Sequence, residues 1–163
     1  MAHGYQIKNQ NALHFLTLTT VGWIDIFAYK RYREIIVDSL NFCIKNKGLV
    51  LHAWVIMSNH VHILISTLPG SPLLNVILQN HKKFTAVQSN KLLNRTGKFW
   101  EEESFDTLIR NNDHYYNCVN YIIQNPVKAG LVKEWHAWEW TYLHPELKKE
   151  FGTPVPNKSE DTF

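Results

Sequence analysis

Two runs of apolar and β-branched residues lie close together near the middle of the chain, and they restrict its fold more than any other feature. The first run is Leu49–Met57, the second is Val61–Ser66, and the polar pair Ser58-Asn59 joins them. Runs of this length, bounded by turn residues, are typical of β-strands. Because the connection is so short, we expect a hairpin or a pair of neighbouring strands.

The segments on either side predict the remaining elements. Alternation of apolar residues with threonine indicates a strand, and an apolar stripe every three or four positions indicates a helix. On these criteria we expect a strand over His14–Thr20, a helix over Tyr29–Lys47, a helix over residues 72–93, a strand within Phe99–Ile109 and a helix over residues 114–125. The order β-α-β-β-α-β-α predicts an α+β fold, a ferredoxin-like sandwich in which helices pack on an antiparallel β-sheet.

Capping and stop residues predict where these helices begin and end. Gly48 is expected to end the first helix, because glycine readily adopts the left-handed conformation just past a helix end. Ser71 is expected to cap the second helix and Asp113 the third. Pro126 is expected to end the third helix at Asn125, because proline disfavours helical geometry in the residue before it.

Length and composition indicate one folded domain. The chain has 163 residues, of which 45% are hydrophobic and 19% charged, and a chain of this size can bury a core without disulfide or metal staples. We expect a single domain over residues 1–150, closed by a tryptophan-rich segment within residues 127–144. Residues 151–163 are mostly polar and contain two prolines, which predicts a disordered tail.

Cysteine content and hydropathy indicate where the protein works. Cys43 and Cys118 are too few for a disulfide framework, and both are expected to be small buried hydrophobes. No apolar run approaches the ~20 residues of a membrane span, and the N-terminus lacks the pattern of a signal peptide. We therefore expect a cytoplasmic protein without a membrane partner.

Positive charge is concentrated in the first 100 residues. This part holds 11 lysines and arginines against three acidic residues, the remainder holds six basic and 11 acidic residues, and the formal net charge is +3. A basic region suits a polyanion, since lysine and arginine side chains that neutralise phosphates release condensed counterions. An ordinary solvated surface gives the same asymmetry, so charge alone does not choose between the two interpretations.

His60 and His62 stand at the start of the second central strand. Residues two apart on a strand point to the same face, so the two imidazoles are expected side by side, while Val61, Ile63 and Ile65 face the other way. Imidazoles at this spacing can share one metal ion. Two polar residues on a solvated sheet face give the same pattern, so spacing alone leaves both interpretations open.

A tyrosine and an asparagine share one face of the third predicted helix. Tyr121 and Asn125 are four residues apart, and Asn125 lies at the helix end, where its amide oxygen is free to reach a metal. A tyrosine beside a metal ion can attack phosphorus, because the metal polarises the phosphate and stabilises the developing charge. Periodicity does not choose among Tyr115, Tyr116 and Tyr121, and each also fits a core aromatic with its hydroxyl at the rim.

Two segments together resemble a known family. Met57-Ser58-Asn59-His60-Val61-His62 resembles the Met-x-Asn-His-hydrophobic-His signature of single-tyrosine HUH transposases. The segment that begins at Tyr121 and reads Tyr-Ile-Ile-Gln-Asn-Pro-Val-Lys-Ala-Gly-Leu resembles the Tyr-Ile-x-x-Asn-Pro-Val-x-Ala-Gly-Leu stretch of their REP-associated tyrosine transposase branch. The resemblance covers about residues 10 to 135, and the two motifs occur in the family's order.

The resemblance implies a metal-dependent single-strand DNA endonuclease and strand transferase with the HUH fold. His60 and His62 would bind a divalent metal, Mg²⁺ or Mn²⁺. Tyr121 would attack a phosphodiester and leave a 5′-phosphotyrosine linkage and a free 3′-hydroxyl, and a 3′-hydroxyl attacking that linkage would rejoin the strand. Many relatives place a glutamine one helical turn after the tyrosine. Here Asn125 stands there and Gln124 one position earlier, and Asn125 is the expected third ligand.

The resemblance also implies partners, namely single-stranded DNA, DNA hairpins and a possible homodimer in which the tyrosine helix can come from the partner. Five cations of the first two helices are candidates for contacts with phosphates, although each also fits ordinary helix-surface charge: Arg31, Arg33, Lys82, Lys83 and Lys91. Four aromatic residues could stack unpaired bases but fit closure of the core better: Trp135, Trp138, Trp140 and Tyr142.

Three further features carry plainer expectations. His52 and His81 are expected to be structural or surface residues, and Glu101–Glu103 a solvated acidic turn from which one carboxylate could approach the metal.

Two other functions fit part of this pattern. A domesticated or inactive protein would bind DNA hairpins without cleaving them, although the intact set of His60, His62 and Tyr121 disfavours that alternative. A metal-dependent nuclease that activates water would need the histidines but not the tyrosine. A covalent protein–DNA adduct separates the three functions, because only the tyrosine transposase forms one.

Overall fold

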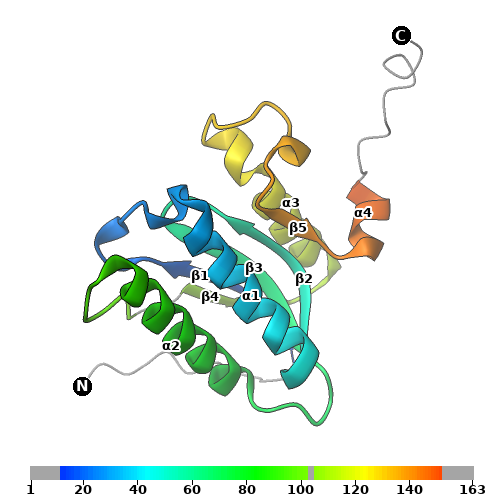
Figure 1. Cartoon of the computed structure of the whole chain (residues 1–163). Helices are drawn as coiled ribbons and strands as arrows, with labels where there is room; N and C mark the ends of the chain where they lie inside the picture. Colours follow the sequence, from blue (N-terminus) through cyan, green and yellow to red (C-terminus); the bar gives the residue numbers. More distant parts are fainter. Residues whose placement is uncertain (1–11, 103–104, 152–163) are drawn as a thin grey trace.

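The strands and helices follow the predicted order, and helices lie on both faces of one antiparallel sheet (Figure 1). The computed structural model describes residues 12–102 and 105–151. The strands are β1 (His14–Thr19), β2 (Leu49–Ile56), β3 (His60–Thr67), β4 (Phe105–Leu108) and β5 (Thr141–Leu143). The helices are α1 (Lys30–Lys47), α2 (Leu74–Leu93), α3 (Asn112–Lys128) and α4 (Pro145–Phe151), with 3₁₀ turns at Val21–Trp23, Ile26–Ala28 and Trp135–Ala137.

The sheet has the strand order β4-β1-β3-β2-β5, and every neighbouring pair is antiparallel. The α+β, ferredoxin-like sandwich is therefore confirmed, with β5 added beside β2 as an edge strand that the sequence predicted only as a closing segment. Among the described residues, no helix is long and apolar enough to cross a membrane.

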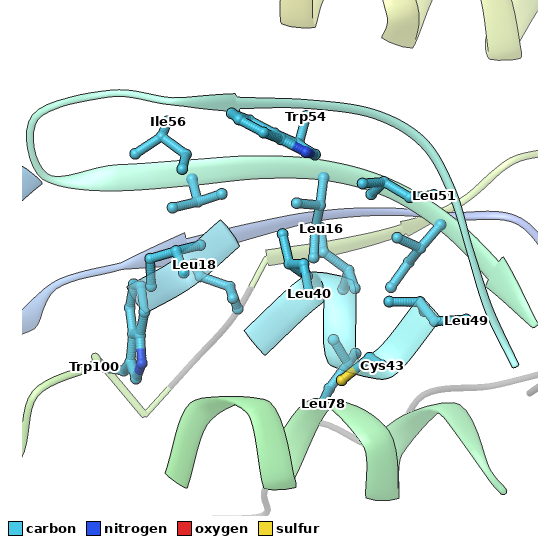
Figure 2. Close-up of a cluster of buried hydrophobic side chains, with 14 of the residues drawn as sticks. Leu16, Leu18, Leu40, Cys43, Leu49, Leu51, Trp54, Ile56, Leu78 and Trp100 are labelled. Atoms are coloured by element: carbon cyan, nitrogen blue, oxygen red, sulfur yellow. The ribbon is translucent and has the colours of Figure 1, made fainter. Parts of the chain in front are cut away.

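The alternation of side chains along β3 divides the interior into two layers. Val61, Ile63 and Ile65 are buried in the layer between the sheet and helices α1 and α2. Figure 2 shows this layer, where side chains from the sheet meet Leu40 of α1 and Leu78 of α2. The other face of β3 packs against α3 through Leu64.

A bulge in β2 changes which side chains of that strand face each layer. Ala53 pairs with Leu64 and Leu51 with Ile65, so His52 is an extra residue on β2. An extra residue shifts the alternation of a strand by one position. Residues on both sides of the bulge, such as Leu51 and Trp54, therefore reach the layer under α1 and α2.

The extra residue has a structural role, as the sequence predicted. His52 Nδ1 lies 3.1 Å from the hydroxyl oxygen of Tyr115, and its Nε2 lies 3.0 Å from Ser66 Oγ. Burial, with a smaller effect of the nearby His144, lowers the pKa of His52 to about 4. A neutral imidazole thus ties the bulge to α3.

The predicted end of the third helix is wrong. Pro126 lies inside α3, which continues to Lys128. Proline removes one backbone donor and disfavours helical geometry in the residue before it, but these costs do not stop the helix here: the carbonyl of Asn125 accepts from the N–H of Ala129 at 3.0 Å. The loss of one hydrogen bond in the last turn does not end the helix.

Two predicted caps are also wrong, and one stop is confirmed. The side chain of Asn111, and not Asp113, accepts from the N–H of His114 at 2.8 Å and caps α3. Ser71 lies three residues before α2, and its hydroxyl donates to the carbonyl of Gly48 at 3.4 Å instead. Gly48 ends α1 with a φ of 71°, the left-handed conformation that favours glycine.

The tryptophan-rich segment closes both layers. Trp135 and Trp138 pack against the layer under α3, and Trp140 and Tyr142 pack against the layer under α1 and α2. The indole N–H of Trp138 also donates to the carbonyl of Ile56 at 3.1 Å. Closure of the core, the preferred of the two roles predicted for these aromatics, is confirmed.

The remaining predictions on chain organisation have mixed outcomes. Cys43 and Cys118 are buried and free, as predicted. Phe151, the first residue of the predicted tail, ends the unpredicted helix α4, and residues 152–163 lie outside the described residues. The assignment of residues 1–150 to one domain stays a prediction.

The strand β4 is joined to β1 by a buried polar contact that the sequence did not reveal. His14 Nδ1 and Asp106 Oδ1 are 2.9 Å apart, and each side chain is 1% exposed. Two ionisable groups so far from water stabilise the fold only while they are paired.

The histidine that joins α1 to α2 predicts a pH dependence of stability. His81 is 2% exposed, its Nδ1 lies 2.7 Å from Ser39 Oγ, and burial, with the nearby Lys82, lowers its pKa to about 4. The unfolded chain takes up this proton near pH 6.5, so stability should fall as pH drops from 6.5 towards 4. Between pH 7 and pH 5 the free energy of unfolding should fall in both proteins, measured by urea denaturation. We expect the fall to be about 2 kcal/mol smaller in His81→Asn than in wild type. Equal losses in the two proteins would contradict this assignment.

Candidate functional site

His60 and His62 lie side by side on the face of β3 that looks towards α3, as the strand alternation predicts. Their ring centroids are 4.7 Å apart, and the rings meet edge to face. His62 is 5% exposed and His60 is half-buried. The two imidazoles therefore form a compact pair beneath α3.

Tyr121 completes this cluster from α3. Its ring centroid lies 5.2 Å from that of His62, and the side chain is 45% exposed. Tyr115 and Tyr116, the other two candidates, lie elsewhere: the first contacts His52, and the second packs on the ring of α4's last residue. Of the three tyrosines, Tyr121 is thus the one that lies beside the histidine pair.

Phe15 of β1 joins the histidine to the tyrosine, and sequence reasoning missed it. Its ring stacks on His62 at 5.5 Å between centroids and meets Tyr121 edge to face at 5.8 Å. Phe15 is 7% exposed and pairs with Leu64 across the sheet. Only the β1–β3 register could have placed this side chain next to His62, and that register was not predicted.

Two hydrogen bonds orient the imidazoles. Thr17 pairs with His62 across the sheet, and its Oγ1 lies 2.8 Å from His62 Nδ1. Asn59, the residue before His60, places its Oδ1 2.7 Å from His60 Nδ1. In both rings Nδ1 is engaged, which leaves Nε2 for another partner.

Burial keeps the pair neutral. It lowers the pKa of His62 to about 3, with a smaller effect from His60, and it also lowers the pKa of His60. His62 Nε2 is buried and has no hydrogen-bond partner among the described residues. A neutral imidazole with an unpartnered nitrogen is the form that binds a divalent metal, so the residues fit such an ion.

The candidate third ligands follow Tyr121 along α3. Gln124 and Asn125 are both half-buried, and neither is hydrogen-bonded to a histidine in the described part of the chain. At 3.6 residues per turn, Asn125 projects between Tyr121 and the buried Ile122, whereas Gln124 projects beyond Tyr121 on its other side. Asn125 therefore lies nearer the buried side of α3 than Gln124 does.

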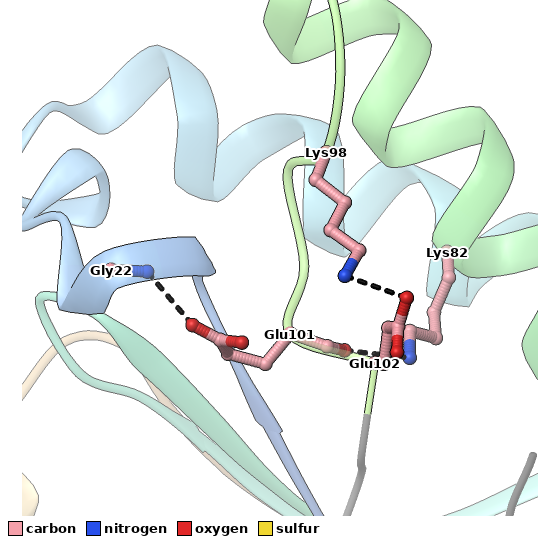
Figure 3. A network of polar contacts seen from close by, with 5 residues as sticks. All are labelled: Gly22, Lys82, Lys98, Glu101 and Glu102. Atoms are coloured by element: carbon pink, nitrogen blue, oxygen red, sulfur yellow. Dashed lines mark hydrogen bonds and ion pairs between the residues drawn. The ribbon is translucent and has the colours of Figure 1, made fainter. Parts of the chain in front are cut away.

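The acidic turn is held by specific contacts. Glu101 Oε1 accepts from the backbone N–H of Gly22 at 2.8 Å, and Glu102 pairs with Lys98 at 2.7 Å (Figure 3). Glu103 lies outside the described residues. Within the described ranges, no group of three or more histidine, cysteine or acidic side chains is arranged to hold a metal ion.

The five cations predicted to contact DNA lie on α1 and α2, across the sheet from the histidine pair. Arg33 covers the ring of Trp140 at 4.4 Å, and burial lowers its pKa. The Nζ of Lys82 donates to the carbonyl of Glu101 at 3.4 Å (Figure 3), and burial lowers its pKa too. Arg31, Lys83 and Lys91 are exposed.

Two of these exposed cations share one surface feature. Lys83 and Lys91 line a shallow groove together with Arg95, a cation that the prediction did not include. The structure thus separates the candidate chemical site on one face of the sheet from the exposed lysines on the other.

The chain is similar to known transposases. The model of the family described as "Transposase IS200 like" matches residues 22–125, which include both histidines and Tyr121. The chain is 26% identical over 106 residues to the REP-associated tyrosine transposase of Escherichia coli strain K12, a match that covers 64% of this chain and 61% of that protein. It is 29% identical over 69 residues to a provisionally named REP-associated tyrosine transposase of Haemophilus influenzae, covering 42% and 39% of the two chains.

A solved structure supports the fold. The structure of a REP-associated tyrosine transposase bound to a REP hairpin superposes with a TM-score of 0.76 at 19% identity, covering 94% of this chain and 89% of that one. The aligned part of this chain spans less than two thirds of the length of both relatives named above.

The Phe15 contacts predict a spectroscopic change. Phe15→Leu should leave the protein folded at a cost of about 1–3 kcal/mol, because leucine fills much of the same space. We expect the ring-proton resonances of His62 to move downfield in NMR spectra, since the stacked ring no longer shields them. Unchanged His62 resonances in a folded variant would show that the stack does not form in solution.

Proposed function

We propose that this chain, which belongs to the IS200-like transposase family, is a metal-dependent single-strand DNA endonuclease and strand transferase that acts near DNA hairpins. The observation that carries this proposal is the packing of Tyr121 against His62, with 5.2 Å between ring centroids, inside a single chain. A water-activating nuclease has no need of a tyrosine at that place.

The chemistry follows from what each side chain can do. A divalent ion such as Mg²⁺ or Mn²⁺, held by Nε2 of His60 and His62, would polarise the scissile phosphate and stabilise its developing charge. The Tyr121 oxygen attacks phosphorus and loses its proton, and the bond to the 3′ oxygen breaks. The products are a 5′-phosphotyrosine and a 3′-hydroxyl. Attack by a 3′-hydroxyl on that linkage reseals the strand and restores Tyr121.

Asn125 is the proposed third protein ligand. It follows Tyr121 by one helical turn and projects towards the sheet side of that residue. Its amide oxygen is a hard donor of the kind that Mg²⁺ and Mn²⁺ accept. Gln124 projects to the other side of Tyr121, and we therefore rank it second.

The proposed substrate is a DNA hairpin with a single-stranded flank. The solved REP-associated tyrosine transposase that shares this fold is bound to a REP hairpin. In this chain, the exposed Lys83 and Lys91 line a groove with Arg95, and three cations along one groove suit a row of phosphates. Arg31, Arg33 and Lys82 are weaker candidates, because each already has a partner within the protein.

The first test is formation of a covalent adduct. Wild-type protein incubated with labelled hairpin DNA and Mn²⁺ should give a species that survives denaturation. Tyr121→Phe should give none, because phenylalanine has no nucleophilic oxygen. Tyr116→Phe, on the same helix but away from the histidines, is the matched control and should form the adduct like wild type.

Other results of the same assay identify the alternatives. Cleavage without an adduct would mean a nuclease that uses water. Binding without cleavage would mean a domesticated hairpin-binding protein. An adduct of equal yield in Tyr121→Phe would place the nucleophile elsewhere.

The second test concerns the groove lysines. Hairpin affinity measured from 50 to 200 mM salt should weaken in Lys83→Ala and in Lys91→Ala. The slope of log affinity against log salt should become shallower by about 0.9 for each phosphate that the variant no longer neutralises. Lys149→Ala, on α4 and paired with Glu146, is the control and should keep the wild-type slope. Wild-type slopes in both groove variants would show that this groove is not the surface that contacts DNA.

A further inference from the structure

We infer that Thr17 and Asn59 are positioning residues that hold His62 and His60 in the tautomer with the proton on Nδ1, so that both Nε2 lone pairs are available to one cation. The inference rests on the proposed function only for the identity of that cation as the metal of the site. The hydrogen bonds themselves belong to the protein alone.

For His60 the chemistry of the acceptor decides the tautomer. An amide oxygen carries no proton, so Asn59 Oδ1, at 2.7 Å, can only accept a hydrogen bond from His60 Nδ1. The other end of the same amide points to the carbonyl of Trp23, with Nδ2 at 3.5 Å, which is the orientation a donor requires. His60 therefore carries its proton on Nδ1 and its lone pair on Nε2.

For His62 the unpartnered nitrogen decides it. The Thr17 hydroxyl, 2.8 Å from Nδ1, can donate or accept. If it donated, the proton of the neutral ring would sit on Nε2, as a buried N–H without any acceptor among the described residues. Orphaned buried N–H groups are rare in folded proteins. With Thr17 as acceptor, Nε2 instead presents a lone pair, which a cation can use.

The surroundings hold the turn before His60 and the ring of His62 in place. The Asn59 carbonyl accepts from the N–H of Thr20 at 3.0 Å and from its hydroxyl at 3.1 Å, which anchors the turn before His60. The Phe15 ring stacks flat on His62 within 15° of parallel. A ring flip of His62 would need both the stack and the Thr17 contact to break, so the ring orientation is held before any ligand arrives.

The experiment compares three substitutions of threonine. Thr17→Val keeps the shape and removes the hydroxyl, and Thr17→Ser restores it. Thr67→Val is the matched control, because Thr67 lies at the far end of β3 opposite Leu49, away from the histidines. ¹⁵N NMR of the histidine rings reports the tautomer without metal, and electron paramagnetic resonance of Mn²⁺ reports affinity. Circular dichroism confirms that each variant is folded.

We expect wild-type His60 and His62 to carry their protons on Nδ1. In Thr17→Val, His62 should become a mixture of tautomers, and Mn²⁺ affinity should fall about 10–100-fold, as when the outer partner of a ligating histidine is removed. Thr17→Ser and Thr67→Val should keep the wild-type affinity, whereas Asn59→Ala should redistribute the proton of His60.

Two results would overturn the inference. One is a wild-type His62 with its proton on Nε2, and the other is wild-type Mn²⁺ affinity in folded Thr17→Val. Failure of the proposed function gives a different pattern. If the Thr17 series behaves as expected but wild type forms no adduct with DNA, the positioning role stands and the strand-transfer function does not. If wild type binds no Mn²⁺ at all, both the metal site and the positioning role of Thr17 and Asn59 are rejected.

Discussion

Three hydrophobic side chains of β3 pack under α1 and α2. Because side chains alternate along a strand, the residues that alternate with these three face α3. Val61, Ile63 and Ile65 are buried in the layer under α1 and α2. His60 and His62 therefore lie on the opposite face of β3, the face that looks towards α3. The pairing of β1 with β3 then sets Phe15 and Thr17 beside the histidines. The position of the candidate site thus depends on the hydrophobic packing on the opposite face of the sheet. A shift of one residue in the register of β3 would turn both histidines to that opposite face.

Much of the fold and part of the site could be predicted because they rest on local patterns. The two-residue period places His60 and His62 together, and the apolar stripes give α1 and α2. The choice of Tyr121 over its two neighbours came from the resemblance to a family, and periodicity could not have made it. The helix boundaries failed where a local rule competes with tertiary context, as at Pro126, whose missing donor costs little in the last turn.

The rest could not be predicted because it depends on pairing between distant residues. Thr17 and His62 are 45 residues apart, and His14 and Asp106 are 92 apart. No periodicity within a segment reports which residues of two strands stand opposite each other. The bulge at His52 could not be predicted from the sequence either. An extra residue in a mostly apolar run is recognised only when the pairing with the neighbouring strand is known.

A site that holds its own tyrosine has a kinetic consequence. Tyr121 and His62 meet inside one chain. Under the proposed function, a single molecule would carry the groups for the first cut, and with DNA in excess that step would be first order in protein. An arrangement in which a second chain lends the tyrosine would be second order at low concentration and would vanish on dilution. In the proposed mechanism Tyr121 is the one nucleophile of each chain, so each chain would retain only one DNA end until that end is resealed.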